Sequence, residues 1–218
     1  MNNIYLDIET IPHQSPDFKA KLRENIKPPG SIKKPESIAA WMAENADAAV
    51  DEAVAKTSFD PAYGHICCLG FAIDDSPVQY YEARAVEDER AVLESFFDAL
   101  PKLGLHCIIG HNVAAFDMRF ILCRSVVLGV KIPPMVPRDI KPWSETIFDT
   151  MTAWAGARGT ISQDNLAKAL GLSGKGDFDG SMVAAAWANG EHSRIADYCL
   201  RDVETVRAIH RRFEAVGY

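Results

Sequence analysis

The stretch IYLDIET, residues 4–10, places two acids one residue apart at the end of an apolar run. The run predicts a buried strand over residues 3–8. Successive side chains of a strand point to opposite faces, so we expect Asp7 and Glu9 on the same face. Neighbouring carboxylates repel each other, and burying them is costly unless a positive group lies between them. A divalent cation held by oxygen ligands meets that need, so the stretch predicts part of a metal site.

Strands and helices alternate along the rest of the chain, as apolar periodicity and turn residues indicate. We expect further strands over 65–73, 78–82, 105–110 and, as an edge strand, 147–149. We expect helices over 36–56, 87–100, 114–128, 162–170, 180–189 and 191–215. The tight turn between the second and third strands makes them an antiparallel hairpin. This order predicts an α/β fold, a mixed sheet flanked by helices, with the site beyond the strand ends where strand order reverses.

Composition indicates an ordinary globular protein. The chain has 218 residues, 48% hydrophobic and 24% charged, which fits one large domain. Its 5 cysteines lack C-x-x-C spacing and mostly lie in apolar stretches, so we expect buried free thiols in a reducing compartment. No signal peptide and no apolar stretch of membrane-spanning length is recognisable. We therefore expect a soluble, cytoplasmic protein without a membrane partner.

The charge distribution leaves the partner open. A net charge of −7 is unusual for a nucleic-acid-binding protein, although a metal site requires acids and its cations reverse the local field. Basic residues dominate 19–34, where Glu24 is the one acid. A second basic cluster near the C-terminus consists of Arg207, His210, Arg211 and Arg212. Each group could contact phosphates or form a solvated basic surface.

Asp117 is the first candidate for a further metal ligand. It follows a predicted strand and falls in the first turn of a predicted helix, where the helix dipole stabilises an acid. A dipole-stabilised surface aspartate is therefore one interpretation. The other is a functional acid at a strand end, with Asn112 and Phe116 supplying a polar group and a ring beside it.

Tyr198 and Asp202 are the second candidates. They are four residues apart on the last predicted helix, so they lie one above the other on one face. They could be ordinary surface residues. They could also be a metal-binding carboxylate with a phenol above it that orients a water molecule.

Taken together, the three fragments resemble a known family. D-x-E on a first strand, N-x-x-x-F-D at a strand-to-helix junction and Y-x-x-x-D on a late helix resemble the three exonuclease motifs of the DEDD superfamily, tyrosine subclass. Within it the chain is similar to the predicted 3′–5′ exonucleases related to the proofreading domain of family-B DNA polymerases. Further similarity runs through residues 60–70, 164–172 and 174–183, so the resemblance covers nearly the whole chain. It implies a ribonuclease-H-like fold.

The resemblance also implies roles for individual residues. Two Mg²⁺ or Mn²⁺ ions would be held by Asp7, Glu9, Asp117 and Asp202, and Tyr198 would orient the attacking water. Substrate contacts would come from Thr10, Ile11, His111, Asn112 and Phe116. The substrate would be a nucleic acid with a free 3′ end, with DNA favoured over RNA.

Several alternatives accompany these roles. Phe116 could be a core aromatic instead, and His111 could cap the helix. Asp149 is another conspicuous acid, for which a loop or helix-cap role is favoured over metal binding. An exoribonuclease, a non-catalytic nucleic-acid-binding module and an unrelated metal hydrolase of small nucleotides are the competing functions.

One exonuclease domain is expected over residues 1–218, with a helical or loop insertion at about 13–58 near the site. No polymerase domain follows, so we expect a stand-alone nuclease or an accessory subunit.

Overall fold

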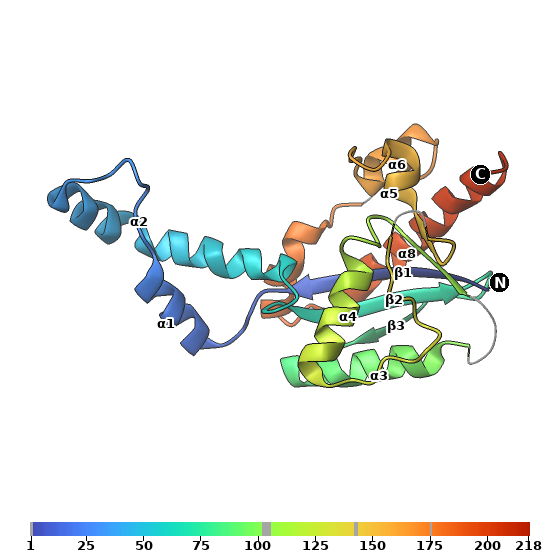
Figure 1. Cartoon of the computed structure of the whole chain (residues 1–218), viewed down its shortest axis with the longest axis horizontal. Helices are drawn as coiled ribbons and strands as arrows, with labels where there is room; N and C mark the ends of the chain where they lie inside the picture. The colour runs from blue at the N-terminus through green and yellow to red at the C-terminus, as the bar shows by residue number, and fades with distance from the viewer. Residues whose placement is uncertain (1, 102–105, 142–143, 175) are drawn as a thin grey trace.

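The computed structural model describes residues 2–101, 106–141, 144–174 and 176–218, and its centre is a five-stranded mixed sheet in the order β3-β2-β1-β4-β5 (Figure 1). The strands are β1 (Asn2–Ile11), β2 (His65–Ile73), β3 (Gln79–Glu82), β4 (His106–Gly110) and β5 (Ile147–Asp149). Strand β1 is antiparallel to β2 and parallel to β4, and β2 is antiparallel to β3. The predicted mixed sheet is confirmed, with β5 at its edge. Leu105, the predicted start of the fourth strand, lies outside the described residues.

Eight α-helices accompany the sheet within the described part of the chain. They are α1 (Pro16–Asn25), α2 (Pro35–Lys56), α3 (Glu89–Ala99), α4 (Asp117–Leu128), α5 (Thr150–Ala155), α6 (Gln163–Ala169), α7 (Val183–Ala188) and α8 (His192–Glu214). The six predicted helices are present, although the one expected from residue 114 begins at Asp117. Helices α1 and α5 were not predicted from the sequence.

Alternation along β1 distributes its side chains between two layers. Ile4, Leu6 and Ile8 are buried in the main core, which α3 and α4 complete on one side of the sheet (Figure 1). Tyr5 points the other way and packs with Val203 of α8. Asp7 and Glu9 continue the series of Tyr5, so they face the side of the sheet that α8 covers.

The chain leaves the sheet after β1 to form an arm of two antiparallel helices, α1 and α2, which projects from the body (Figure 1). The 22 residues of α2 span about 33 Å. Lys19 pairs with Asp51 at 2.6 Å and Arg23 pairs with Asp47, so part of the basic 19–34 stretch is neutralised within the arm. Most side chains of the arm are exposed.

A buried ion pair joins α3 and α4, the two helices that cover the main core. Arg124 of α4 donates two hydrogen bonds to Glu89 of α3, at 2.8 and 2.7 Å, and both side chains are almost fully buried. Glu89 also accepts from the backbone of Ile66 at 2.9 Å. Burial raises the pKa of Glu89, but hydrogen bonds from His65, Arg124 and Ile66 outweigh it and hold the pKa below its usual value.

The second basic cluster is engaged within the fold. Arg207 is buried and donates to Glu204 and to the backbone of Ser76, Arg211 pairs with Asp75, and His210 hydrogen-bonds the Tyr5 hydroxyl at 3.2 Å. Three of its four members therefore have structural partners, and a phosphate-binding role for the cluster is not favoured.

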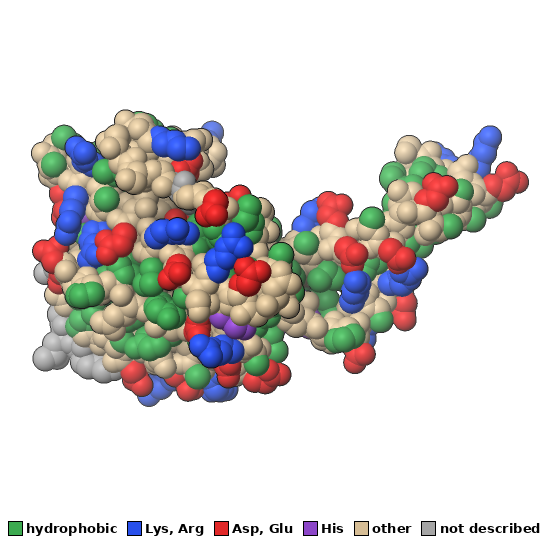
Figure 2. Space-filling view, turned by 180° about the vertical axis from the view of Figure 1, so that it is seen from behind, with side chains coloured by type: hydrophobic (Ala, Val, Ile, Leu, Met, Phe, Trp, Pro, Cys, Tyr) green, Lys and Arg blue, Asp and Glu red, His purple; other side chains and the backbone are tan. Residues whose placement is uncertain are grey.

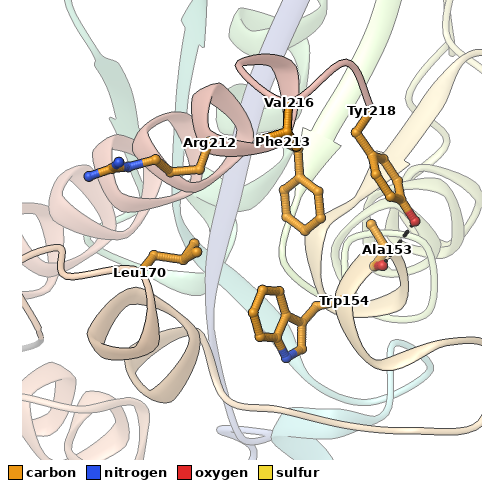
Figure 3. A pocket seen from close by; sticks show the side chains of 7 residues that line it. All are labelled: Ala153, Trp154, Leu170, Arg212, Phe213, Val216 and Tyr218. Carbon is orange, nitrogen blue, oxygen red and sulfur yellow. Dashed lines mark hydrogen bonds between the residues drawn. The ribbon is translucent and has the colours of Figure 1, made fainter.

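An apolar hollow of about 380 Å³ lies at the end of α8, where the rings of Trp154, Phe213 and Tyr218 gather (Figure 3). The Tyr218 hydroxyl donates to the carbonyl of Ala153 at 3.0 Å. Phe213 lies about 16 Å along α8 from Asp202 at the usual rise per residue, so this hollow is separate from the candidate site.

The five cysteines are free, and four of them are buried, as predicted. No helix among the described residues is both long and apolar enough to cross a membrane.

Candidate active site

The end of β1 holds the first two acids. Ligand atoms of Asp7, Glu9 and Cys199 lie within 4.8 Å of one another, which confirms that the two acids share a face. Glu9 is buried, and the register of β1 with β2 shifts directly after it, between Glu9 and Thr10. Such irregularities re-aim side chains at the edge of a sheet and are frequent beside active sites.

Asp117 approaches the same strand end from α4. Its Oδ1 atom accepts a hydrogen bond from the backbone N–H of Ile8, the residue between the two acids, at 3.0 Å. Asp117 is 4% exposed, so the surface-aspartate interpretation is wrong. Burial, with a smaller contribution from the negative charges of Asp149 and Asp202, raises the pKa of Asp117 to about 7 against the lowering effect of backbone hydrogen bonds.

Helix α8 reaches the site because β2 carries a glycine opposite Asp7. Gly70 pairs with Asp7 in the β1–β2 register, and a Cβ atom at Gly70 would lie 2.9 Å from Cys199 Sγ and 3.1 Å from a methyl group of Val203. The missing side chain lets α8 pack directly on the sheet. The Cys199 thiol also donates to the carbonyl of Asp7 at 3.5 Å, which ties the helix to the strand that bears the acids.

Tyr198 and Asp202 are therefore brought to the acids of β1 by the packing of α8. Both are 4% exposed, so the alternative of ordinary surface residues is wrong. Burial raises the pKa of Tyr198, and the charges of Asp202 and Glu9 raise it further. The phenol is consequently protonated at neutral pH and can act as a hydrogen-bond donor.

Gln163 of α6 holds Asp202 in place. Its side-chain amide donates to the Asp202 backbone carbonyl at 3.0 Å and to Oδ1 at 3.4 Å. No sequence pattern predicts this role of Gln163, because a glutamine at the start of a predicted helix carries no signal of a partner 39 residues away.

Asp149 shapes the loop that carries the second motif. It caps α5, accepting from the backbone of Met151 at 3.0 Å, and it also accepts from the backbone N–H groups of Asn112 and Ala114 at 3.0 and 3.1 Å. The predicted capping role is confirmed. Asn112 has φ of +62°, a conformation uncommon outside glycine, and its bond to Asp149 helps to hold it there.

His111 joins this loop to the helices beyond β5. Its Nδ1 atom pairs with the Thr150 hydroxyl at 3.0 Å and its Nε2 atom with the carbonyl of Ile161 at 2.8 Å. The alternative that His111 caps the following helix is wrong, because both bonds go elsewhere. Contact with a phosphate stays a prediction.

The other three predicted substrate contacts lie around the same strand end. Thr10 donates from Oγ1 to the carbonyl of Ser58 at 2.8 Å. Ile11 is 1% exposed, so little of its side chain is accessible to a substrate. Phe116 is half-buried and packs on Phe120 with ring centroids 5.5 Å apart, so its core role and its accessibility coexist.

The donor set fits a hard divalent cation. Asp7, Glu9, Asp117 and Asp202 offer carboxylate oxygens, the ligands that Mg²⁺ and Mn²⁺ prefer. Burial of several carboxylates together is unfavourable without a compensating positive charge, as the raised pKa of Asp117 shows. The Cys199 thiol lies nearby, but hydrogen bonding to Cys68 and burial raise its pKa, so it remains protonated and is a poor ligand.

Comparison with known families identifies the chain. Residues 65–216 match the family described as "Predicted 3'-5' exonuclease related to the exonuclease domain of PolB". This chain belongs to that family. Exonuclease domains of this type generally use divalent cations, in agreement with the donor set. The match contains Asp117, Tyr198 and Asp202, whereas Asp7 and Glu9 precede it.

Among solved structures, the family B DNA polymerase from the hyperthermophilic archaeon Pyrobaculum calidifontis is similar in fold, with a TM-score of 0.60 and 16% sequence identity. The similarity covers 97% of this chain and 24% of the polymerase, so the chain spans about a quarter of that protein's length. The ribonuclease-H-like fold is thereby confirmed. No protein in the curated comparison matches the chain.

Proposed function

We propose that the chain is a metal-dependent 3′–5′ exonuclease that removes nucleotides from the 3′ end of single-stranded DNA. The observation that carries the proposal is the convergence of four acids from β1, α4 and α8, elements far apart in sequence. Family membership supports the reaction, and the buried tyrosine on α8 supports the subclass.

The side chains of the candidate site have different roles in the proposed reaction. Asp7, Glu9, Asp117 and Asp202 would hold two divalent cations, which when bound supply positive charge for the attacking and leaving oxygens of a phosphodiester. Tyr198 stays protonated and donates a hydrogen bond that orients the attacking water. Gln163 fixes the rotamer of Asp202, so this carboxylate needs no rearrangement before the reaction.

One face of the molecule lacks the clustered basic side chains that a strand bound along it would need. Figure 2 shows basic and acidic side chains interspersed over the body and the arm on this face of the molecule. Non-specific nucleic-acid binding relies on clustered lysines and arginines. The proposed recognition therefore relies on the strand end that enters the site rather than on this face.

Two competing functions use the same fold. An exoribonuclease would use the same acids, and only a comparison of substrates separates it from a DNA exonuclease. A non-catalytic binding module would be expected to lack one of the acids, and all four are present.

The test follows cleavage of 5′-end-labelled single-stranded DNA, duplex DNA and RNA with Mg²⁺, with Mn²⁺ or with EDTA. We expect stepwise shortening of single-stranded DNA from its 3′ end, abolished by EDTA. Asp7→Asn and Asp202→Asn should each abolish digestion, whereas Asp139→Asn, an exposed control carboxylate, should leave it unchanged. Internal cuts, absence of cleavage, or near-normal activity of Asp7→Asn would reject the proposal.

Tyr198→Phe is the second variant of the test. It removes the donor but keeps the ring that contacts Phe178, with centroids 5.2 Å apart. Turnover should slow by about 10-fold to 100-fold without loss of metal dependence. An unchanged rate would assign Tyr198 to packing alone.

A further inference from the structure

An exposed aromatic residue, Phe59, stands at the base of the arm beside the candidate site. It ends the 3-10 helix η1 (Thr57–Phe59) and its side chain is 73% exposed. Single exposed apolar side chains are common on protein surfaces, so exposure alone assigns no role. Its position relative to the acids is what distinguishes Phe59.

Hydrogen bonds fix η1 to the residues that follow the first two acids. Thr10, next to Glu9, donates to the carbonyl of Ser58 at 2.8 Å, and the backbone N–H of His13 donates to the Thr57 hydroxyl at 2.9 Å. Gly64 lies against the same turn, where a Cβ atom would be 2.5 Å from the Thr57 carbonyl. Phe59 is thus held at a set distance from the end of β1.

The ring of Phe116 lies next to the ring of Phe59. The two ring centroids are 6.4 Å apart and the ring planes are inclined at 53° to each other, so the rings are adjacent but not stacked on one another. Phe116 directly precedes Asp117 in sequence and is anchored on Phe120 in the core. Phe116 is therefore next to one acid of the site in sequence, and Phe59 is linked to another, Glu9, through the hydrogen bond between Ser58 and Thr10.

We propose that Phe59 and Phe116 form a stacking ledge for one base of the strand whose 3′ end lies at the acids, a role that rests on the proposed function. A ring stacks on any base, because every base has a π-face, so the ledge suits an enzyme that accepts every sequence. The neighbours of Phe59 are polar: Lys56, Ser58 and Asp60 surround it in sequence. A protein partner would require a wider apolar patch than these two rings supply.

Phe59 lies outside the residues 65–216 that match the family. The ledge consequently combines Phe116, which lies inside the matched segment, with a residue of η1, which precedes it. The arm would then serve as the support that brings a second ring to the strand.

The experiment uses single-stranded DNA in which one abasic nucleotide is moved step by step inward from the 3′ end. In the wild type, one position of the abasic nucleotide should raise KM by about 5-fold to 150-fold, the loss of one stacked base. Phe59→Ala should raise KM for intact DNA and weaken the position-specific effect, because one of the two stacking rings is then missing. Phe59→Trp should retain it.

Tyr80→Ala is the matched control, since Tyr80 is an exposed ring on β3 at the far edge of the sheet and should leave the wild-type pattern intact. The proposal is overturned if Phe59→Ala keeps the wild-type positional effect, or if the wild type shows none. If the wild type cleaves no strand, the proposed function fails separately. Fluorescence anisotropy with the same abasic strands then decides the ledge by the same two criteria.

Discussion

Replacing Gly70 by alanine tests whether close packing of α8 on β2 positions the site. The added Cβ atom would lie 2.9 Å from Cys199 Sγ and 3.1 Å from Val203, whereas ordinary contacts begin near 3.4 Å. The helix or the strand must therefore move by about 0.5 Å. Because Tyr198 and Asp202 flank Cys199 on α8, the displacement reaches the candidate site directly.

Both stability and turnover should respond. Overpacking of a core contact costs about 1–3 kcal/mol, which in a domain of this size lowers the Tm by roughly 2–12 °C. Misplacement of catalytic groups by a fraction of an ångström should lower kcat by about 10-fold to 100-fold. Thermal unfolding and the cleavage of end-labelled single-stranded DNA measure the two effects on the same preparation.

A compensating variant separates the steric effect from others. Cys199→Ala removes the sulfur atom that meets the new Cβ, so the double variant should recover more of the turnover than Gly70→Ala retains alone. Gly180→Ala is the matched control, since a Cβ there meets nothing within 4 Å and its Tm and kcat should stay near wild type. Wild-type stability and turnover in Gly70→Ala would refute the reasoning.

Three further perturbations concern the buried ion pair and the acids. Glu89→Gln leaves the Arg124 charge buried without its partner and should cost about 3–5 kcal/mol in urea unfolding, whereas Glu94→Gln on the same helix, half-exposed, should cost under about 1 kcal/mol. Folding lowers the pKa of Glu89, so the contribution of Glu89 to the free energy of unfolding is fully present above pH 4.5 and is lost as the pH falls through the pKa of the folded state. Glu89→Gln should lack this acid-dependent loss of stability. Mn²⁺ should raise the Tm of the wild type with increasing concentration and raise that of Asp7→Asn less, and equal shifts would contradict metal binding at the acids.

The sheet and most helices were predictable because their patterns are local. Alternation along β1, the apolar run of β2 and the helical spacing in α3 and α8 are read within a few residues. Helix α1 was missed because it has no buried residue and is held by ion pairs to α2, which leave no apolar period in the sequence. Helix α5 was missed because its six residues are too short for a period and its cap, Asp149, is shared with the preceding loop.

The four candidate acids are distinguished in the sequence for a different reason. Asp117 and Asp202 were each ambiguous alone, and only their order with Asp7 and Glu9 distinguished them from ordinary acids. The supporting residues Gln163, Gly70 and Phe59 could not be found in this way. Their roles depend on contacts across 39 residues or more, which come into being only when the chain folds.

The position of β1 explains how acids outside the matched segment belong to the same site. Strand β1 lies between β2 and β4, both within the match, and pairs with β2 from Ile4 to Ile11 and with β4 from Asn2 to Tyr5. Without β1 the sheet would separate into two parts with unpaired edges and an uncovered core. The same pairing that completes the sheet sets Asp7 opposite Gly70, under α8. The first two acids are therefore located by the requirement that the sheet be continuous.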